Sequence, residues 1–332
     1  MRICFLGTGT WGYCLATLLA LNGHQVTSWS LDPSLVERLS SGGDHPFLPG
    51  HKPKPGMRFT TDLAEALNGA EMIVEAVTSA GFREVLNRIK EITNPKVVFV
   101  ITSKGIEQIS GEILPEVAIE VFGEEFKPYV GMLSGPSFAA EVIQGLPTSV
   151  VASSYAFDDM RMIAEAFTNK SFRVYPNNDV KGVAFGGALK NIVAIACGVS
   201  DGMGLGNSTK AALITRGLHE IRKLAVACGC KAETLNGLSG LGDLCLTCSS
   251  PLSRNYRFGE LLAKGNSPQD SKSQIKMVVE GAYTCVSALQ LSKKHAVPMP
   301  ISEVVYKLIY EGVKCKEAIS LLMERPIKEE HL

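Results

Sequence analysis

The chain has 332 residues, more than one hydrophobic core usually serves, so two domains are expected. Apolar residues make up 45% and charged residues 20%, as in a water-soluble globular protein, and 33 basic residues balance 33 acidic ones. Without a basic excess, the composition argues against a nucleic-acid or membrane-surface partner. The nine cysteines lack the spacing of a disulfide framework, which favours a reducing cytoplasm.

A glycine-rich turn lies near the N-terminus. Apolar residues 3–6 precede Gly7-Thr8-Gly9-Thr10-Trp11-Gly12, and a helix pattern follows. Strand, G-x-G-x-x-G and helix form the dinucleotide-binding fingerprint. The first glycine permits the tight turn, the second lets the backbone approach a pyrophosphate, and the third lets helix and strand pack closely. The helix N-terminus then attracts the phosphates. Asp32, twenty residues past Gly12, supports this interpretation.

Other interpretations of this segment are open. Residues 3–23 carry no charge, as in a membrane span or signal peptide. Glycines and polar residues dilute the stretch, however, and it lacks a convincing cleavage site. The turn could also bind another nucleotide, or none. We expect a bound dinucleotide and no membrane span.

Four cysteines form a candidate zinc site, Cys228-x-Cys230 with Cys245-x-x-Cys248. The first pair is one residue tighter than the usual zinc-ribbon spacing. Cys228 also lies among apolar residues of a helix pattern, where free cysteine is a common small hydrophobe. We therefore expect buried thiols and no metal.

The first half of the chain alternates short apolar runs with amphipathic segments, which is typical of βαβ units and a largely parallel sheet. Strands are expected at 2–6, 25–30, 72–77, 97–102, 130–134, 149–152 and 172–175. Helices are expected at 33–41, 63–68, 82–92, 111–121, 137–144 and 158–168. Residues 42–56 have little periodicity and predict a mobile surface loop, a possible flap over the site.

Beyond Pro176 the pattern changes to long helices, expected at 183–199, 210–227, 273–295 and 302–310. We therefore expect an α/β Rossmann-like dinucleotide-binding domain over residues 1–179 and an all-α substrate-binding domain over residues 180–332.

Two lysines occupy unusual positions. Lys104 follows an expected strand, at the edge where open α/β sheets bind ligands. Lys190 and Asn191 interrupt an otherwise apolar helix. A lysine there must snorkel, pair or function. We expect function, because burial and a nearby second cation would lower its pKa toward a useful range.

Two further segments offer anion-binding groups. Ser134–Ala139 runs from an expected strand into a helix start. Ser253-Arg254-Asn255 follows Gly240-Leu241-Gly242-Asp243-Leu244, and its clustered donors suit a phosphate. The alternative for the second segment is an ordinary solvated helix start with Ser253 as its cap.

The segments GTGTWG, SKG, SGPSFA, GGALKNIVAI, LITRGL, GLGDL, SRNYRFG and VVEG occur in this order. With them, the chain resembles bacterial NAD(P)-dependent glycerol-3-phosphate dehydrogenases from Met1 to about Arg325. The resemblance implies a Rossmann-like domain and an all-α, 6-phosphogluconate dehydrogenase-like C-terminal domain in a homodimer. It also implies cytoplasmic interconversion of dihydroxyacetone phosphate and sn-glycerol 3-phosphate with NAD(P)H, which supplies phospholipid synthesis.

The resemblance further implies roles for individual residues. The catalytic group would comprise Lys190 as the proton-transferring residue, with Lys104, Asp243 and Thr247. The substrate would contact Lys104, Gly135, Ser137, Lys190, Asp243, Ser253, Arg254 and Asn255. The cofactor would contact Gly7, Gly9, Thr10, Trp11, Gly12, Lys104, Ala139, Arg254, Val278 and Glu280.

One position departs from the family pattern. Relatives often carry a basic residue before the Asp-Pro pair that ends the second strand, where this chain has Leu31 before Asp32-Pro33. The obvious partner for a 2′-phosphate is therefore missing. Because an acidic residue near this strand end favours a free ribose 2′-OH, NADH should serve at least as well as NADPH.

Two alternative functions are open. A β-hydroxyacid or phosphogluconate-type dehydrogenase also uses a helix-borne lysine beside an asparagine, but the Ser253-Arg254-Asn255 cluster argues against it. A redox sensor could hold NAD(P) without turnover, but it would not need a proton donor such as Lys190 beside Lys104 and Asp243.

Overall fold

The computed structural model describes residues 1–327 and 329–330, and the chain divides into two compact units. Unit 1 comprises Met1–Ser103 and Leu114–Val180, and unit 2 comprises Lys104–Ile113 and residues 181 to the C-terminus. The predicted domain boundary after residue 179 does not account for the segment Lys104–Ile113, which belongs to unit 2. This segment belongs to unit 2 because its side chains bond there; for example, Gln108 donates to the Tyr283 carbonyl at 3.4 Å.

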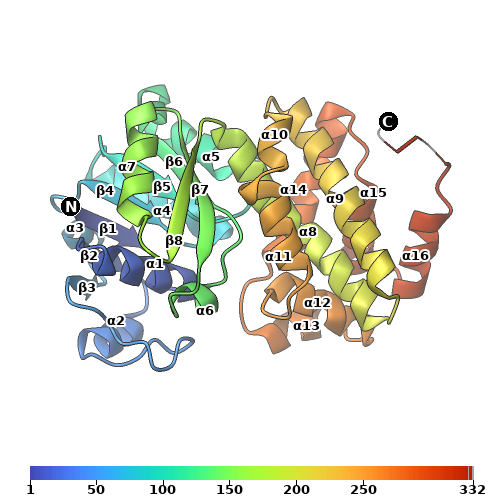
Figure 1. Ribbon diagram of the computed structural model, residues 1–332, viewed down its shortest axis with the longest axis horizontal. Helices are drawn as coiled ribbons and strands as arrows, with labels where there is room; N and C mark the ends of the chain where they lie inside the picture. Colours follow the sequence, from blue (N-terminus) through green and yellow to red (C-terminus); the bar gives the residue numbers. More distant parts are fainter. Residues whose placement is uncertain (328, 331–332) are drawn as a thin grey trace. The chain divides into compact units, whose positions relative to one another are not determined.

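Unit 1 is built on an eight-stranded sheet with strand order β3-β2-β1-β4-β5-β6-β7-β8 (Figure 1). Neighbouring strands are parallel except β6 and β7, which are antiparallel. The order reverses at β1 and β4, the kind of switch point where open α/β sheets bind ligands. The strands are β1 (Arg2–Leu6), β2 (Gln25–Trp29), β3 (Met57–Thr60), β4 (Met72–Glu75), β5 (Val98–Ile101), β6 (Val130–Ser134), β7 (Thr148–Ser154) and β8 (Phe172–Asn177).

Strand side chains alternate between two apolar layers, because successive residues of a strand face opposite sides of the sheet. On one face, Ile3 and Phe5 share a core with α1 (Thr10–Leu21), α6 (Ala139–Val142) and α7 (Phe157–Phe167). On the other face, Phe99 contacts Phe122 with ring centroids 6.4 Å apart. Phe122 belongs to α5; the remaining helices are α2 (Pro33–Ser40), α3 (Leu63–Leu67), α4 (Phe82–Ile92) and α5 (Leu114–Phe122).

Strand β3 and the loop before it differ from the sequence-based expectation. β3 was not predicted, because it has only four residues and follows an aperiodic segment. The loop over residues 42–56 is anchored rather than lying loosely on the surface. His45 is 2% exposed, its Nε2 lies 3.1 Å from the Thr8 carbonyl oxygen, and its ring stacks on Tyr13. The loop therefore packs directly on the glycine-rich turn and helix α1.

Unit 2 is helical. Its helices are α8 (Val180–Gly202), α9 (Asn207–Ala227), α10 (Ala232–Leu235), α11 (Asp243–Cys248), α12 (Arg254–Ala263), α13 (Pro268–Ile275), α14 (Glu280–His295), α15 (Pro300–Tyr310) and α16 (Cys315–Met323). Among the described residues, α8 alone is long and apolar enough to cross a membrane. Its most apolar 18-residue stretch is 94% buried inside the protein. Such burial is that of a core helix, packed against its neighbours in the unit.

The prediction of a single helix over residues 273–295 is wrong. The structure has two helices there, α13 and α14, because Lys276 adopts a left-handed conformation with φ 57° and ends α13. Ser267 caps α13 and Pro268 occupies its first turn, so this helix begins earlier than expected. The break places Val278 in the connection between the two helices and Glu280 at the first position of α14.

Candidate active site

The glycine-rich turn has the geometry of a phosphate cradle. Gly7 has φ 96°, and a Cβ on Gly12 would lie 2.1 Å from the Gly7 carbonyl oxygen, so both positions need glycine. A Cβ on Gly9 would meet no atom within 4 Å, which leaves open space beside the backbone. Helix α1 starts without a side-chain cap, and the buried Thr10 Oγ1 has no partner in the described part of the chain. Unused donors beside open space fit a pyrophosphate.

The end of β2 is organised around Asp32. Its Oδ1 caps helix α2, accepting the N–H of Ser34 at 2.9 Å and of Leu35 at 3.2 Å. Hydrogen bonds from Ser34 and Leu35 lower the pKa of Asp32. Leu31 is 66% exposed, and Arg38 donates to the Asp44 carbonyl at 2.6 Å. An acidic group therefore stands at the strand end, and the nearby cation Arg38 is engaged with the main chain.

The segment after β6 is a tight turn. Gly135 has φ 151°, and a Cβ there would lie 2.8 Å from Val150 Cα. The Ser137 hydroxyl donates to the Gly135 carbonyl at 3.1 Å. Helix α6 begins at Ala139 and has only four residues, so the helix expected over 137–144 is too long. The tight turn explains the glycine.

The four residues expected to be catalytic lie in one hydrogen-bonded cluster in unit 2. The Lys104 ammonium lies 2.7 Å from Asp243 Oδ2, and the Lys190 ammonium donates to Asp243 Oδ1. Lys190 also donates to Thr247 Oγ1 at 2.7 Å. Thr247 Oγ1 in turn donates to the Asp243 carbonyl at 2.6 Å, one helical turn away on α11. The cluster joins three segments that are distant in sequence.

A glycine on α8 allows this meeting. Asp243 begins α11, directly after a π-helical turn at Leu238–Gly242. A Cβ on Gly186 would lie only 2.6 Å from the Ser239 carbonyl oxygen of that turn. The turn therefore packs against the α8 backbone itself. Lys190 lies one helical turn after Gly186, within reach of Asp243.

Burial sets the protonation of the cluster. It lowers the pKa of Lys190 to about 8; the Asp243 charge opposes the shift and the Lys104 charge adds to it. Burial alone would raise the pKa of Asp243, but Lys104 and Lys190 together keep it below its usual value. Two ammonium groups around one carboxylate leave a net positive charge. The site can therefore donate a proton and stabilise a developing oxyanion.

The start of helix α12 supplies the other polar group of unit 2. Ser253 is its N-cap, and its Oγ accepts the Tyr256 N–H at 3.2 Å. Ser253 is thus an N-cap, as in the alternative interpretation of this segment. Its hydroxyl group accepts this bond and can still donate its own proton to a ligand. Burial lowers the pKa of Arg254 and the charge of Glu280 opposes this shift, so the two side chains interact electrostatically.

Asn255 is used within the protein. Its Nδ2 donates to Asn191 Oδ1 at 3.0 Å, and its Oδ1 accepts the Gly281 N–H at 2.9 Å. These bonds tie α8, α12 and α14 together. The sequence analysis assigned no site role to Asn191. Its position as a polar residue inside an apolar helix was the signal that could have identified it.

The expected site residues fall on both units. Unit 1 carries Gly7, Gly9, Thr10, Trp11, Gly12, Gly135, Ser137 and Ala139, and unit 2 carries Lys104, Lys190, Asp243, Thr247, Ser253, Arg254, Asn255, Val278 and Glu280. Direct bonds join Lys104, Lys190, Asp243 and Thr247. The three residues that begin α12 and α14, Arg254, Asn255 and Glu280, form the second polar group.

Comparisons with known proteins identify the family of the chain. Residues 2–160 match the family model for the NAD-dependent glycerol-3-phosphate dehydrogenase N-terminus, and residues 179–320 match that for the C-terminus. The chain is 62% identical to the glycerol-3-phosphate dehydrogenase [NAD(P)+] of Protochlamydia amoebophila and 54% identical to that of Chlamydia pneumoniae. Each alignment covers 100% of this chain and 99% of the relative.

A solved structure extends the comparison to three dimensions. The crystal structure of glycerol-3-phosphate dehydrogenase from Coxiella burnetii has 37% sequence identity and a TM-score of 0.92. The alignment covers 98% of this chain and 99% of that one. The chain thus belongs to the NAD-dependent glycerol-3-phosphate dehydrogenase family, over both its N-terminal and C-terminal parts.

Proposed function

We propose that this protein interconverts dihydroxyacetone phosphate and sn-glycerol 3-phosphate with NAD(P)H. The observation that carries the proposal is the buried Lys190–Asp243–Thr247 cluster with Lys104 at its side. Reduction of a ketone to an alcohol needs a hydride at carbon and a proton at oxygen. This cluster has the composition of a proton donor that also stabilises negative charge on that oxygen.

Lys190 is the proposed proton donor. Two of its three ammonium N–H groups bond Asp243 and Thr247 within the described chain, which leaves the third for the substrate oxygen. Its pKa of about 8 lies close to neutral pH, so the group holds a proton and can also release it. Asp243 orients this ammonium, and Thr247 fixes its direction from α11.

Lys104 is proposed to support the same oxygen electrostatically and to contact the substrate. Its side chain is 17% exposed, whereas that of Lys190 is 7% exposed, so Lys104 is the more accessible of the two lysines. Sharing Asp243 between two lysines keeps the carboxylate from neutralising either one completely. The net positive charge is then available to the alkoxide.

The substrate's phosphate is proposed to bind at the start of α12. Arg254 offers a planar fork of donors, Ser253 retains a hydroxyl proton, and the helix N-terminus adds a favourable dipole. Asn255 is proposed to contact the substrate with its remaining amide N–H. Gly135 and Ser137 of unit 1 are the further substrate contacts that the family motif suggests.

The cofactor is proposed to lie on the turn Gly7–Gly12, with its pyrophosphate at the N-terminus of α1 and Thr10 Oγ1 as a side-chain donor. When bound, the reduced nicotinamide supplies the hydride. Trp11, Ala139, Val278 and Glu280 are the remaining proposed cofactor contacts.

A spectrophotometric assay tests the proposal. Purified protein with dihydroxyacetone phosphate should consume the absorbance of NADH or NADPH. In contrast, 2-keto acids with the reduced cofactors, and 6-phosphogluconate with NAD+ or NADP+, should give little turnover. Lys190→Met should reduce turnover by roughly 100-fold or more, the scale of a lost general acid. Lys264→Met, at an exposed lysine in the turn that follows α12, is the matched control. Binding of NADH without turnover of any substrate would favour the sensor alternative and refute the proposal.

We also infer three finer properties. The product would supply the glycerol backbone of phospholipids, the protein would work in the cytoplasm, and it would form a homodimer. Their support is the family resemblance together with the cysteine usage. Labelling of lipids in cells that lack the protein, fractionation of cells and sedimentation of the purified protein test them in turn.

A further inference from the structure

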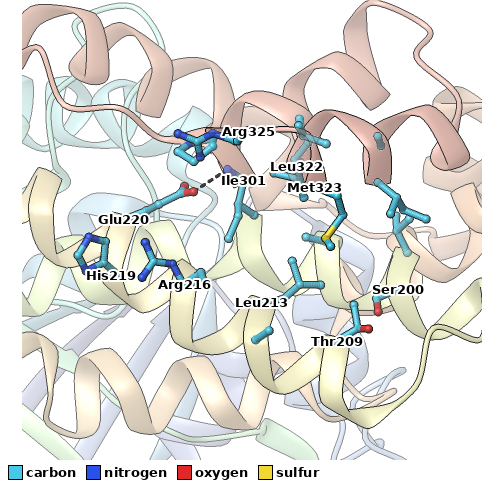
Figure 2. A pocket seen from close by; sticks show the side chains of 18 of the residues that line it. Ser200, Thr209, Leu213, Arg216, His219, Glu220, Ile301, Leu322, Met323 and Arg325 are labelled. Carbon is cyan, nitrogen blue, oxygen red and sulfur yellow. Dashed lines mark hydrogen bonds between the residues drawn. The ribbon is translucent and has the colours of Figure 1, made fainter. Parts of the chain in front are cut away.

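Unit 2 contains a cavity that the proposed reaction does not use. It has a volume of about 520 Å³ and lies among α8, α9, α15, α16 and the tail after α16 (Figure 2). None of the catalytic residues Lys104, Lys190, Asp243 and Thr247 lines it, nor does Arg254. Its volume is within the range of small-molecule sites.

The cavity follows one face of α9. Thr209, Leu213, Arg216 and Glu220 line it at spacings of three or four residues, which puts them on one side of the helix. At a rise of about 1.5 Å per residue, this face extends over roughly 16 Å. Figure 2 shows Ser200 and Thr209 toward one end, Arg216, Glu220 and Arg325 toward the other, and Leu213 between them. The cavity is therefore elongated, with polar ends.

Apolar side chains form much of the lining. Val199 of α8, Leu213 of α9, Val304 and Leu308 of α15, and Ile319 and Leu322 of α16 contribute to the walls. Water gains few hydrogen bonds against such walls, whereas a hydrocarbon chain removes its own apolar surface from solvent there. The walls therefore favour an extended apolar segment.

One end offers cations to a ligand. Within the described chain, Arg216 has no carboxylate partner and donates to the Glu330 main-chain carbonyl at 2.6 Å. Arg325 interacts electrostatically with Glu220. The Glu220 carboxyl already accepts the N–H of Ile301 at 2.6 Å and of Ser302 at 3.3 Å, at the positive end of α15.

Further acidic and basic side chains line the cavity. His219 and Lys223 of α9, with Glu329 and Glu330 of the tail, also line the cavity, and the two tail residues are exposed to solvent. Burial raises the pKa of Glu220 to about 7, so near neutrality this carboxyl is partly uncharged. The guanidinium groups then leave this end favourable to an anion.

The other end contains an unused hydroxyl. Ser200 is 2% exposed, and its Oγ has no hydrogen-bond partner in the described part of the chain. Buried hydroxyl groups are rarely left unsatisfied, because burial without a partner costs free energy. Ser200 lines the cavity, so a ligand atom can supply the missing hydrogen bond.

We propose that this cavity binds an elongated amphiphile with an anionic head, an apolar middle and a hydrogen-bonding far end. Arg216 and Arg325 would take the head, the walls of α8, α9, α15 and α16 the chain, and Ser200 the far group. A medium-chain carboxylate with a terminal hydroxyl has this chemistry.

Calorimetric titration of the full-length protein tests the proposal with ω-hydroxydodecanoate, dodecanoate, dodecyltrimethylammonium and acetate, each below its micellar concentration. We expect saturable binding of one ω-hydroxydodecanoate per chain. Dodecanoate should bind more weakly, the cationic chain at least tenfold more weakly still, and acetate not measurably. Removing the hydroxyl by Ser200→Ala should abolish the difference between the two carboxylates.

Three variants locate the site. Leu213→Trp should fill the cavity and abolish binding, and Ile319→Trp should do so from α16 if the first variant fails to fold. Arg216→Gln should weaken binding by about tenfold or more, the effect of one charged hydrogen bond. Arg222→Gln, on α9 but outside the cavity lining, should leave it unchanged. Binding that is unsaturable or equal for both head charges would overturn the proposal, as would binding insensitive to the tryptophan variants. A change in the sedimentation coefficient of the tryptophan variants would also overturn the proposal, because it would show that this surface contacts a second copy of the chain.

Discussion

At the scale of single residues, the proposed proton transfer depends on the Asp243 carboxylate, which two lysines share. Asp243 accepts from both Lys104 and Lys190, so neither lysine is fully neutralised by its own partner. Lys190 is the more buried of the two, and burial brings its pKa to about 8. The more deeply buried of the two lysines is thereby the better suited to exchange a proton near neutrality.

This protonation predicts a pH dependence of opposite sign for the two directions. Reduction needs the Lys190 ammonium, so kcat/KM for dihydroxyacetone phosphate should fall as pH rises through about 8. Oxidation of glycerol 3-phosphate needs the neutral amine and should rise over the same range. Initial rates measured from pH 6 to pH 10, in about one-unit steps around this pKa, decide it. In Lys190→Met the residual rates should lack this inflection; an unchanged inflection would assign it to another group.

Arg254 allows a second prediction at this scale. Charged hydrogen bonds are worth about 1.5–3 kcal/mol, so Arg254→Ala should lower kcat/KM by roughly 10- to 150-fold. Arg254→Lys should recover only part, because an ammonium cannot form the planar fork. Arg257→Ala, an exposed arginine on the same helix, is the control.

The comparison substrate for Arg254 is dihydroxyacetone, which lacks the phosphate. It should be a very poor substrate, and Arg254→Ala should reduce its turnover less than that of the phosphate ester. Equal losses toward both substrates would show that Arg254 acts on the cofactor or on the fold.

The end of β2 predicts the cofactor preference. Leu31 offers no charge to a 2′-phosphate, the Asp32 carboxylate is held in place as the cap of α2, and Arg38 is engaged with Asp44. NADH should therefore be used at least as well as NADPH, as measured by kcat/KM. Leu31→Arg should shift the ratio toward NADPH. A preference of the unmodified protein for NADPH by about tenfold, or roughly 1.4 kcal/mol, would contradict the prediction.

At the scale of secondary structure, backbone contacts between elements position the site. Gly186 lets the turn before α11 pack on the α8 backbone, and the Asn191–Asn255–Gly281 bonds join α8, α12 and α14. In the same unit, Glu220 of α9 accepts two main-chain N–H groups at the start of α15. Each of these devices connects helices whose sequences lie far apart.

The Glu220 contact predicts a pH-dependent stability. Burial raises the pKa of Glu220 from its ordinary 4.5 to about 7, so the folded state keeps this proton when the unfolded chain has lost it. The contribution is fully present below pH 4.5 and is lost as pH rises through about 7. Glu220→Gln removes the titration. The stability of the unmodified protein relative to this variant should therefore decrease from pH 4.5 to pH 7.

Urea unfolding at several pH values over that window measures the difference. Glu303→Gln is the control, because Glu303 lies on α15 but pairs with Lys307 on the exposed side, at 3.2 Å. The same pH dependence in the unmodified protein and in Glu220→Gln would show that another group titrates.

At the scale of the whole molecule, the chain divides into two compact units. Unit 1 carries the glycine-rich turn after β1, and unit 2 carries the lysine cluster and Arg254. The chain enters unit 2 for Lys104–Ile113, returns to unit 1, and leaves it finally after Val180. The proton-handling cluster is thus completed inside one unit by a segment inserted from the middle of the other.

The family resemblance predicts a homodimer at this scale. Sedimentation at micromolar concentration should give a particle of twice the 35.6 kDa mass of one chain. Crosslinking at rising dilution provides a check on concentration dependence. A particle of single-chain mass at all concentrations would contradict the expectation.

The sequence by itself determined the local features of this protein. The period of apolar residues identified most strands and helices, and the spacing of Gly7, Gly9 and Gly12 predicted the tight turn between β1 and α1, because these patterns depend on near neighbours. It also singled out Lys190, since a charge in an apolar helix is unusual wherever the helix lies.

Only the tertiary structure decided which distant groups meet. The sharing of Asp243 between Lys104 and Lys190 and the bonds of Asn255 to Asn191 and Gly281 depend on long-range packing. The pKa values of Lys190 and Glu220 depend on burial, which no local pattern specifies. Local periodicity sets what each segment prefers, whereas contacts between segments set the electrostatic environment that makes a side chain reactive.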